Sequence, residues 1–140
     1  MEMAEDRGTF EHTADMGVWG AGDDPGEAIL NAARAMFGLA PAEQGEEEAP
    51  TITKSIGSEG GTLVELLVET LNEMLSVSDL EGMRVMRIRD GGFEHGPPFR
   101  LRASMEGTGR MGDGTEEMTE IKAATYHRAG VVEDPAGRWT

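Results

Sequence analysis

Asp15 is the residue whose type and setting point most directly to chemistry. It closes the run His12-Thr13-Ala14-Asp15 and is followed closely by Gly17, so a hard cation could approach its short carboxylate. Oxygen ligands of this kind suit calcium or magnesium. The residues alone favour a plainer alternative, in which Asp15 hydrogen-bonds its own backbone in a turn, as aspartate commonly does.

Three other side chains could take part. His12 could be a ligand or a base, but a single strand histidine is more often packed or hydrogen-bonded. Lys122 is the only lysine in the second half of the chain, where a strand lysine is usually a solvated edge residue. His12, Asp15 and His127 could form an acid–base set. However, the chain has no cysteine and no serine in a nucleophile-elbow context, so an independent hydrolase is disfavoured.

Two helices are predicted to position these residues. The first spans residues 25–38: Asp24 is placed to cap it, Pro25 suits the first position, and Glu27 completes a capping box. Gly38 is a natural end. The second spans residues 62–77 and begins at the capping pair Thr62 and Glu65. Its apolar residues recur at helical spacing and predict a core-facing stripe of Leu63, Leu67, Leu71, Met74 and Leu75.

The strand signals lie around these helices. A first strand is predicted at Thr9–His12, and Thr51–Ile56 favours an edge strand, because Lys54 falls in phase with its isoleucines. Met83–Arg89, a turn at Asp90-Gly91-Gly92 and Phe99–Glu106 predict a hairpin. Phe99–Glu106 alternates, with Phe99, Leu101, Ala103 and Met105 inward.

The remaining stretches complete the prediction. The run Ile121–His127 also alternates, Asp134–Gly137 indicates a turn, and Gly107–Glu117 is a glycine-rich loop. Pro41–Pro50 is an acidic surface loop, and residues 1–8 indicate a frayed polar tail. The sequence therefore predicts one α+β domain over residues 9–140. It has two layers, with two amphipathic helices on one face of a mainly antiparallel sheet.

The composition excludes several classes of function. Twenty-seven acidic residues against twelve basic ones give a formal charge of −15, which disfavours direct binding to nucleic-acid phosphates. An acidic face that meets a basic partner remains compatible with this charge. Arg87, Arg89, Arg100 and Arg102 indicate a local basic band, which is interpreted as a solvent face balanced by acids or, less favourably, as an RNA or partner contact. Neither a membrane span nor a secretory pattern is present, so we expect a cytosolic protein.

Blocks of the sequence resemble the archease family in order and spacing. His12-Thr13-Ala14-Asp15 stands where the family has its HTAD signature, and Glu27–Phe37 matches its first helix. The run LVELLVETLNEML, at Leu63–Leu75, resembles its second helix, and Ile121–His127 reads like its KAATYH strand. The resemblance covers most of the chain and implies an archease-like fold.

The resemblance also implies a function. Archeases assist the GTP-dependent tRNA-splicing RNA ligase, so we expect a non-enzymatic activator that promotes ligase guanylylation and multiple turnover in tRNA processing. It implies that Asp15 binds a divalent metal, calcium in the first place, and that Lys122 and His12 belong to the surface that contacts the ligase. The alternative is a small chaperone-like or metal-dependent protein that acts independently of RNA ligation. Ten methionines could offer it an adaptable surface, although most are expected to fill the core.

The end of the sequence carries one further expectation. In archeases a last strand ends in an aspartate followed by an apolar residue, and that aspartate shares the metal with the HTAD aspartate. Here Arg138-Trp139-Thr140 only begins such a strand, and Asp134 belongs to the preceding turn. The C-terminal strand is therefore expected to be missing, which would leave weak metal binding in a shortened archease or in a variant of lowered activity.

Overall fold

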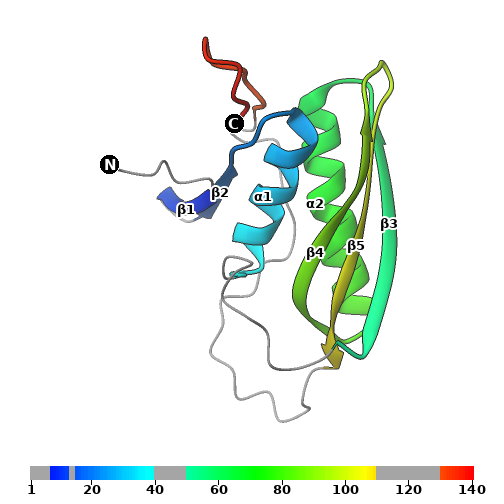
Figure 1. Cartoon of the computed structure of the whole chain (residues 1–140). Helices are drawn as coiled ribbons and strands as arrows, with labels where there is room; N and C mark the ends of the chain where they lie inside the picture. The colour runs from blue at the N-terminus through cyan, green and yellow to red at the C-terminus, as the bar shows by residue number, and fades with distance from the viewer. Residues whose placement is uncertain (1–6, 13–14, 40–49, 110–129) are drawn as a thin grey trace.

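The described residues fold into two antiparallel sheets and two helices (Figure 1). The structure is a computed structural model that describes residues 7–12, 15–39, 50–109 and 130–140. The elements in chain order are β1 (Arg7–His12), β2 (Asp15–Gly20), α1 (Pro25–Met36), β3 (Ile52–Gly60), α2 (Leu63–Leu80), β4 (Met83–Glu94) and β5 (Phe99–Gly109). The predicted α+β class with two amphipathic helices is confirmed.

The strands form two separate groups within the described residues. β1 and β2 make one two-stranded sheet, and the other three strands are ordered β3-β5-β4. In Figure 1, α2 lies along one face of the three-stranded sheet, and α1 lies between α2 and the β1–β2 pair. Neither described helix is long and apolar enough to cross a membrane.

The core lies between the three-stranded sheet and the helices. Leu66 and Met74 of α2 and Met83, Leu101 and Met105 of the sheet are fully buried. β5 alternates as predicted, since Leu101, Ala103 and Met105 are buried while Arg100 and Arg102 are exposed. Leu63, Leu67 and Leu75 of the predicted stripe are only partly buried, because the centre of the buried face of α2 lies at Leu66, Thr70 and Met74.

Local capping explains where the helices begin and end. Oδ1 of Asp24 accepts from the Glu27 N–H, and Oγ1 of Thr62 accepts from the Glu65 N–H, as predicted. α1 stops at Met36, because Gly38 adopts φ +69° and the next amides bond back to the carbonyls of the last turn. α2 runs three residues beyond its predicted end at 77, since the first residue after the start of α2 that has a positive φ is Gly82.

Three predictions are corrected by the strands. Asp90-Gly91-Gly92 is not a hairpin turn but a bulge inside β4: Oδ1 of Asp90 accepts from the Gly92 N–H, Gly92 has φ +127°, and pairing with β5 resumes beyond it. The chain reverses instead at His95–Pro98. Arg7 and Gly8 belong to β1, so the predicted tail is wrong there. Gly107–Gly109 were predicted to begin a glycine-rich loop, but they belong to the end of β5.

Candidate functional site

The hairpin of β1 and β2 carries the sequence-predicted site. His12, the last residue of β1, is the register partner of Asp15, the first residue of β2. Directly opposed residues of an antiparallel pair have Cα atoms about 5 Å apart. The backbone thus places these two predicted residues side by side at one end of the hairpin. Thr13 and Ala14 between them lie outside the described residues.

The other end of this hairpin is fixed against α1 by close backbone contact. A Cβ atom on Gly20 would overlap the backbone at Ala28 and Ala32 of the helix, so only glycine allows the approach. Nδ2 of Asn31, which is buried, donates to the carbonyl oxygen of Ala21 at 2.8 Å. Since the hairpin is anchored at Gly20 and Ala21, the position of Asp15 is set relative to the helix layer through β2.

The C-terminal segment lies against the same part of the hairpin. The Gly22 N–H donates to the Trp139 carbonyl at 2.9 Å, and the Trp139 N–H donates back at 2.8 Å, which makes an antiparallel bridge just after β2. Oδ1 of Asp134 accepts from the N–H groups of Ala136 and Arg138, each at 2.9 Å. The prediction that Asp134 belongs to a turn is therefore confirmed.

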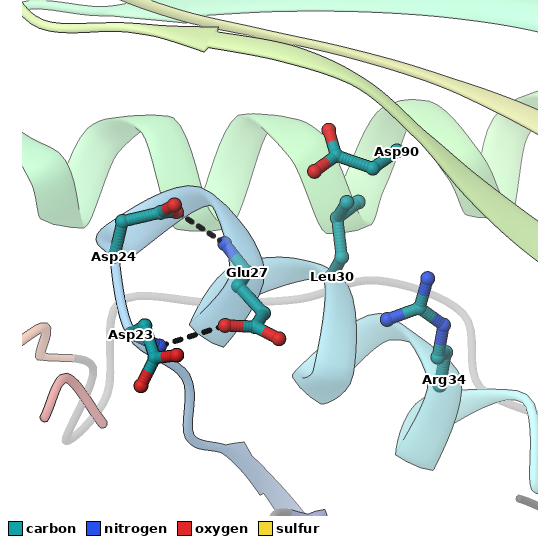
Figure 2. A pocket seen from close by; sticks show the side chains of 6 residues that line it. All are labelled: Asp23, Asp24, Glu27, Leu30, Arg34 and Asp90. Carbon is teal, nitrogen blue, oxygen red and sulfur yellow. Dashed lines mark hydrogen bonds between the residues drawn. The ribbon is translucent and has the colours of Figure 1, made fainter.

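A second group of acidic side chains gathers at the start of α1, around a hollow of about 350 Å³ (Figure 2). Its lining residues are Asp23, Asp24, Glu27, Leu30, Arg34 and Asp90. Sequence reasoning identified Asp24 and Glu27 only as capping residues. It missed Asp90, which comes from β4, because only the tertiary fold brings that strand beside α1.

Most polar groups around this hollow already have structural partners. Glu27 accepts from the Asp23 N–H at 2.7 Å while its own N–H bonds Asp24 (Figure 2). Arg34 donates to Asn31 Oδ1 at 2.8 Å and to the Ile88 carbonyl at 2.7 Å. Among residues whose placement is described, no group of three or more histidines or carboxylates is arranged to hold a metal ion. The hollow is therefore best explained by helix capping and by the attachment of α1 to β4.

Other predicted site residues lie outside the described parts of the chain. These are Lys122 and His127, both in the Ile121–His127 run. Most of the predicted acidic surface loop between Pro41 and Pro50 also lies outside the described residues. The structure brings His12 and Asp15 together and does not test the predicted role of either.

Known proteins align with nearly the whole length of this chain, and one solved structure has the same fold. The protein archease of Pyrococcus abyssi (strain GE5 / Orsay) is 33% identical over 132 residues, which span 93% of this chain and 90% of that protein. The protein archease of Methanopyrus kandleri (strain AV19) is 34% identical over 135 residues, at 93% and 91%. The solution structure of Methanobacterium thermoautotrophicum protein 1598 superposes with a TM-score of 0.71 at 27% identity, covering 95% of this chain and 92% of that one.

The family model agrees with these individual comparisons. The model of the Archease protein family (MTH1598/TM1083) matches residues 8–140, which is nearly the whole chain and includes both His12 and Asp15. With the fold, the paired signature residues and the relatives in agreement, the chain belongs to the archease family.

Proposed function

We propose that this protein is a non-enzymatic activator of the GTP-dependent tRNA-splicing RNA ligase. It promotes guanylylation and multiple turnover of the ligase and acts in the cytosol. One observation carries the proposal: His12 and Asp15, the first and last residues of the HTAD signature, are register partners at the end of β1 and the start of β2. In this proposal Asp15 binds the metal, while His12 and Lys122 contact the ligase.

Calcium fits the chemistry of the proposed ligand. Asp15 supplies a carboxylate, and calcium takes oxygen ligands in flexible geometry. A bound divalent cation would supply positive charge for contact with carboxylate or phosphate groups of the ligase complex. Asp15 starts a strand whose far end is anchored on α1 at Gly20, so the proposed ligand is presented on a fixed element rather than on a long loop.

The charge of the chain supports a division of labour with the ligase. A formal charge of −15 opposes association with an RNA backbone. In the proposal the ligase therefore makes the RNA contacts and performs the catalysis, and the archease acts on the ligase alone.

Guanylylation of the ligase tests the proposal. Purified cognate ligase is mixed with labelled GTP, with and without equimolar archease, and covalent GMP on the ligase is followed in a single turnover. The rate should rise at least tenfold when archease is present, and archease alone should show no turnover of GTP or RNA. The same guanylylation rate in both mixtures would contradict the proposed function.

A further inference from the structure

The three-stranded sheet has one face that neither described helix covers. The helices pack on the other face, where the alternating residues of β5 are buried (Figure 1). Five of the twelve basic residues of this acidic chain lie on the uncovered face, which is called the arginine face below. They are Arg84, Arg87, Arg89, Arg100 and Arg102.

Acidic residues on the same face neutralise three of these arginines. Arg87 and Arg89 both donate to Glu106 at 2.8 Å. Arg100 lies between Glu59, at 3.1 Å, and Glu94, at 3.6 Å. The hydrogen bond and the charge of Glu59 raise the pKa of Arg100 above its ordinary value. The interpretation of the basic band as a balanced solvent face is thus confirmed for Arg87, Arg89 and Arg100.

Arg102 differs from these three because no described residue pairs with it. It is exposed on β5, the central strand, and makes no hydrogen bond or ion pair within the described part of the chain. Its register partners are glycines on both sides, Gly57 on β3 and Gly92 on β4. A Cβ atom at either glycine would meet nothing within 4 Å, so the side-chain positions of these two register partners are unoccupied.

The space around Arg102 suits an anionic group on a flat partner. A shallow hollow of about 80 Å³ adjoins it and is lined by Gly92, Phe93, Glu94, Arg100 and Arg102. A guanidinium presents a planar fork of donors that matches a carboxylate or a phosphate with two hydrogen bonds. Because carboxylates already neutralise Arg87, Arg89 and Arg100, the face around Arg102 suits one anionic group rather than a row of them.

This distribution of charge favours a protein carboxylate over an RNA strand. Single-stranded RNA is usually held by exposed aromatic rings, but the two phenylalanines of these strands, Phe93 and Phe99, pack against the core. An RNA backbone would bring many charges towards a chain of −15, whereas an aspartate or glutamate of a folded partner brings one. Arginine is enriched at the interfaces between proteins.

We propose that the arginine face docks on a protein partner through a carboxylate that Arg102 binds with both arms of its guanidinium. The partner is the RNA ligase, so this inference rests on the proposed function. The contact is separate from the β1–β2 hairpin, and it assigns to the ligase an exposed aspartate or glutamate that faces Arg102.

Ligase binding by variants of Arg102 tests this contact. The dissociation constant of the archease–ligase complex is measured by calorimetry for the natural chain, Arg102→Glu and Arg102→Lys. Arg102→Glu should weaken binding at least tenfold, and Arg102→Lys should weaken it less, because lysine keeps the charge but not the fork. Arg84→Glu makes the same change of net charge at the other end of β4 and should alter binding by less than threefold.

A zero-length cross-link identifies the group that faces Arg102. A carbodiimide joins a lysine amine to a neighbouring carboxylate, and this chain has only Lys54 and Lys122 as natural lysines. In the Arg102→Lys variant, the peptide that contains the new lysine should therefore become cross-linked to an aspartate or glutamate of the ligase. Mass spectrometry identifies that ligase residue. Arg84→Lys, with the same number of lysines, should not give that product.

The outcomes separate the two proposals. If the natural chain binds and stimulates the ligase but Arg102→Glu does so equally well, the docking inference is wrong and the proposed function stands. If the natural chain neither binds nor stimulates the ligase, both are wrong. If Arg102→Glu leaves ligase binding unchanged but abolishes binding of a labelled single-stranded RNA, the arginine face is a nucleic-acid contact instead.

Discussion

Arg34 of α1 donates a hydrogen bond of 2.7 Å to the carbonyl oxygen of Ile88 in β4. The same guanidinium bonds Asn31, whose amide holds the carbonyl of Ala21 just after β2. One chain of polar contacts thus joins the signature hairpin, the first helix and the three-stranded sheet. Asn31 is buried and Arg34 is partly buried, so these contacts are at least partly shielded from bulk water.

Arg34→Ala is expected to destabilise the protein by about 2–3 kcal/mol, because hydrogen bonds to charged groups are strong and the buried Ile88 carbonyl loses a donor. Urea unfolding followed by circular dichroism measures the change in the free energy of unfolding. Arg89→Ala removes an arginine from an exposed ion pair and should cost less than about 1 kcal/mol. Equal losses in the two variants would contradict a special role for Arg34.

Gly20→Ala should disturb the attachment of the signature hairpin. The added methyl group would overlap the backbone of α1, so β2 and the helix must separate, at a cost of about 1–3 kcal/mol or more. Gly57→Ala is the matched control, since its Cβ would enter open space on an exposed strand and should be neutral or slightly stabilising. Thermal unfolding compares the two, and an unchanged melting temperature for Gly20→Ala would refute the close contact.

Asp15→Asn should remove most of the stimulation of ligase guanylylation while leaving the fold intact. The neutral amide keeps the size of the carboxylate but not the charge that a divalent cation requires. Lys122→Ala should weaken stimulation as well. Single-turnover guanylylation measures both effects, and an unchanged circular dichroism spectrum shows that the fold is retained. Full stimulation by Asp15→Asn would rule out a metal-binding role for this residue.

The structural features that could be predicted from the sequence are those fixed by residues close together in the chain. The starting points of the two helices, at Asp24 and Thr62, could be predicted because each capping residue lies three residues before its glutamate. The end at Gly38 follows from the left-handed conformation that glycine adopts readily. The conformation of Asp90-Gly91-Gly92 could not be predicted, since these residues suit either a turn or a bulge. The pairing of β4 with the long strand β5 makes them a bulge.

The candidate site divides in the same way. His12 and Asp15 were predicted from a motif, and a short hairpin places them together. The isolation of Arg102 was not predicted, because it depends on which residues of β3 and β4 lie opposite it. Register between two strands is set by the apolar pattern of both strands and by the turn that joins them, so the sequence of one strand alone does not fix it. The glycines at 57 and 92 carried no local signal of this role.

A strand added after Thr140 tests whether a second carboxylate completes the proposed metal site at Asp15. Trp139 pairs antiparallel with Gly22, so each residue added after Thr140 in that register would lie opposite a residue nearer to Asp15. The archease resemblance implies a second aspartate at the end of such a strand. We therefore expect that appending a family-like strand ending in Asp-Ile will tighten calcium binding at least tenfold in calorimetric titration, because two carboxylates then share the ion.

Two variants of the extended chain make this measurement specific. Asp15→Asn should abolish the gain in calcium affinity, because it removes a proposed ligand. Asp134→Asn makes the same change of charge but should have no effect, since its oxygen is used by the turn and an asparagine oxygen can accept the same bonds. Tight calcium binding by the 140-residue chain itself would show that other oxygens complete the site. A gain that survives Asp15→Asn would place the calcium elsewhere on this acidic protein.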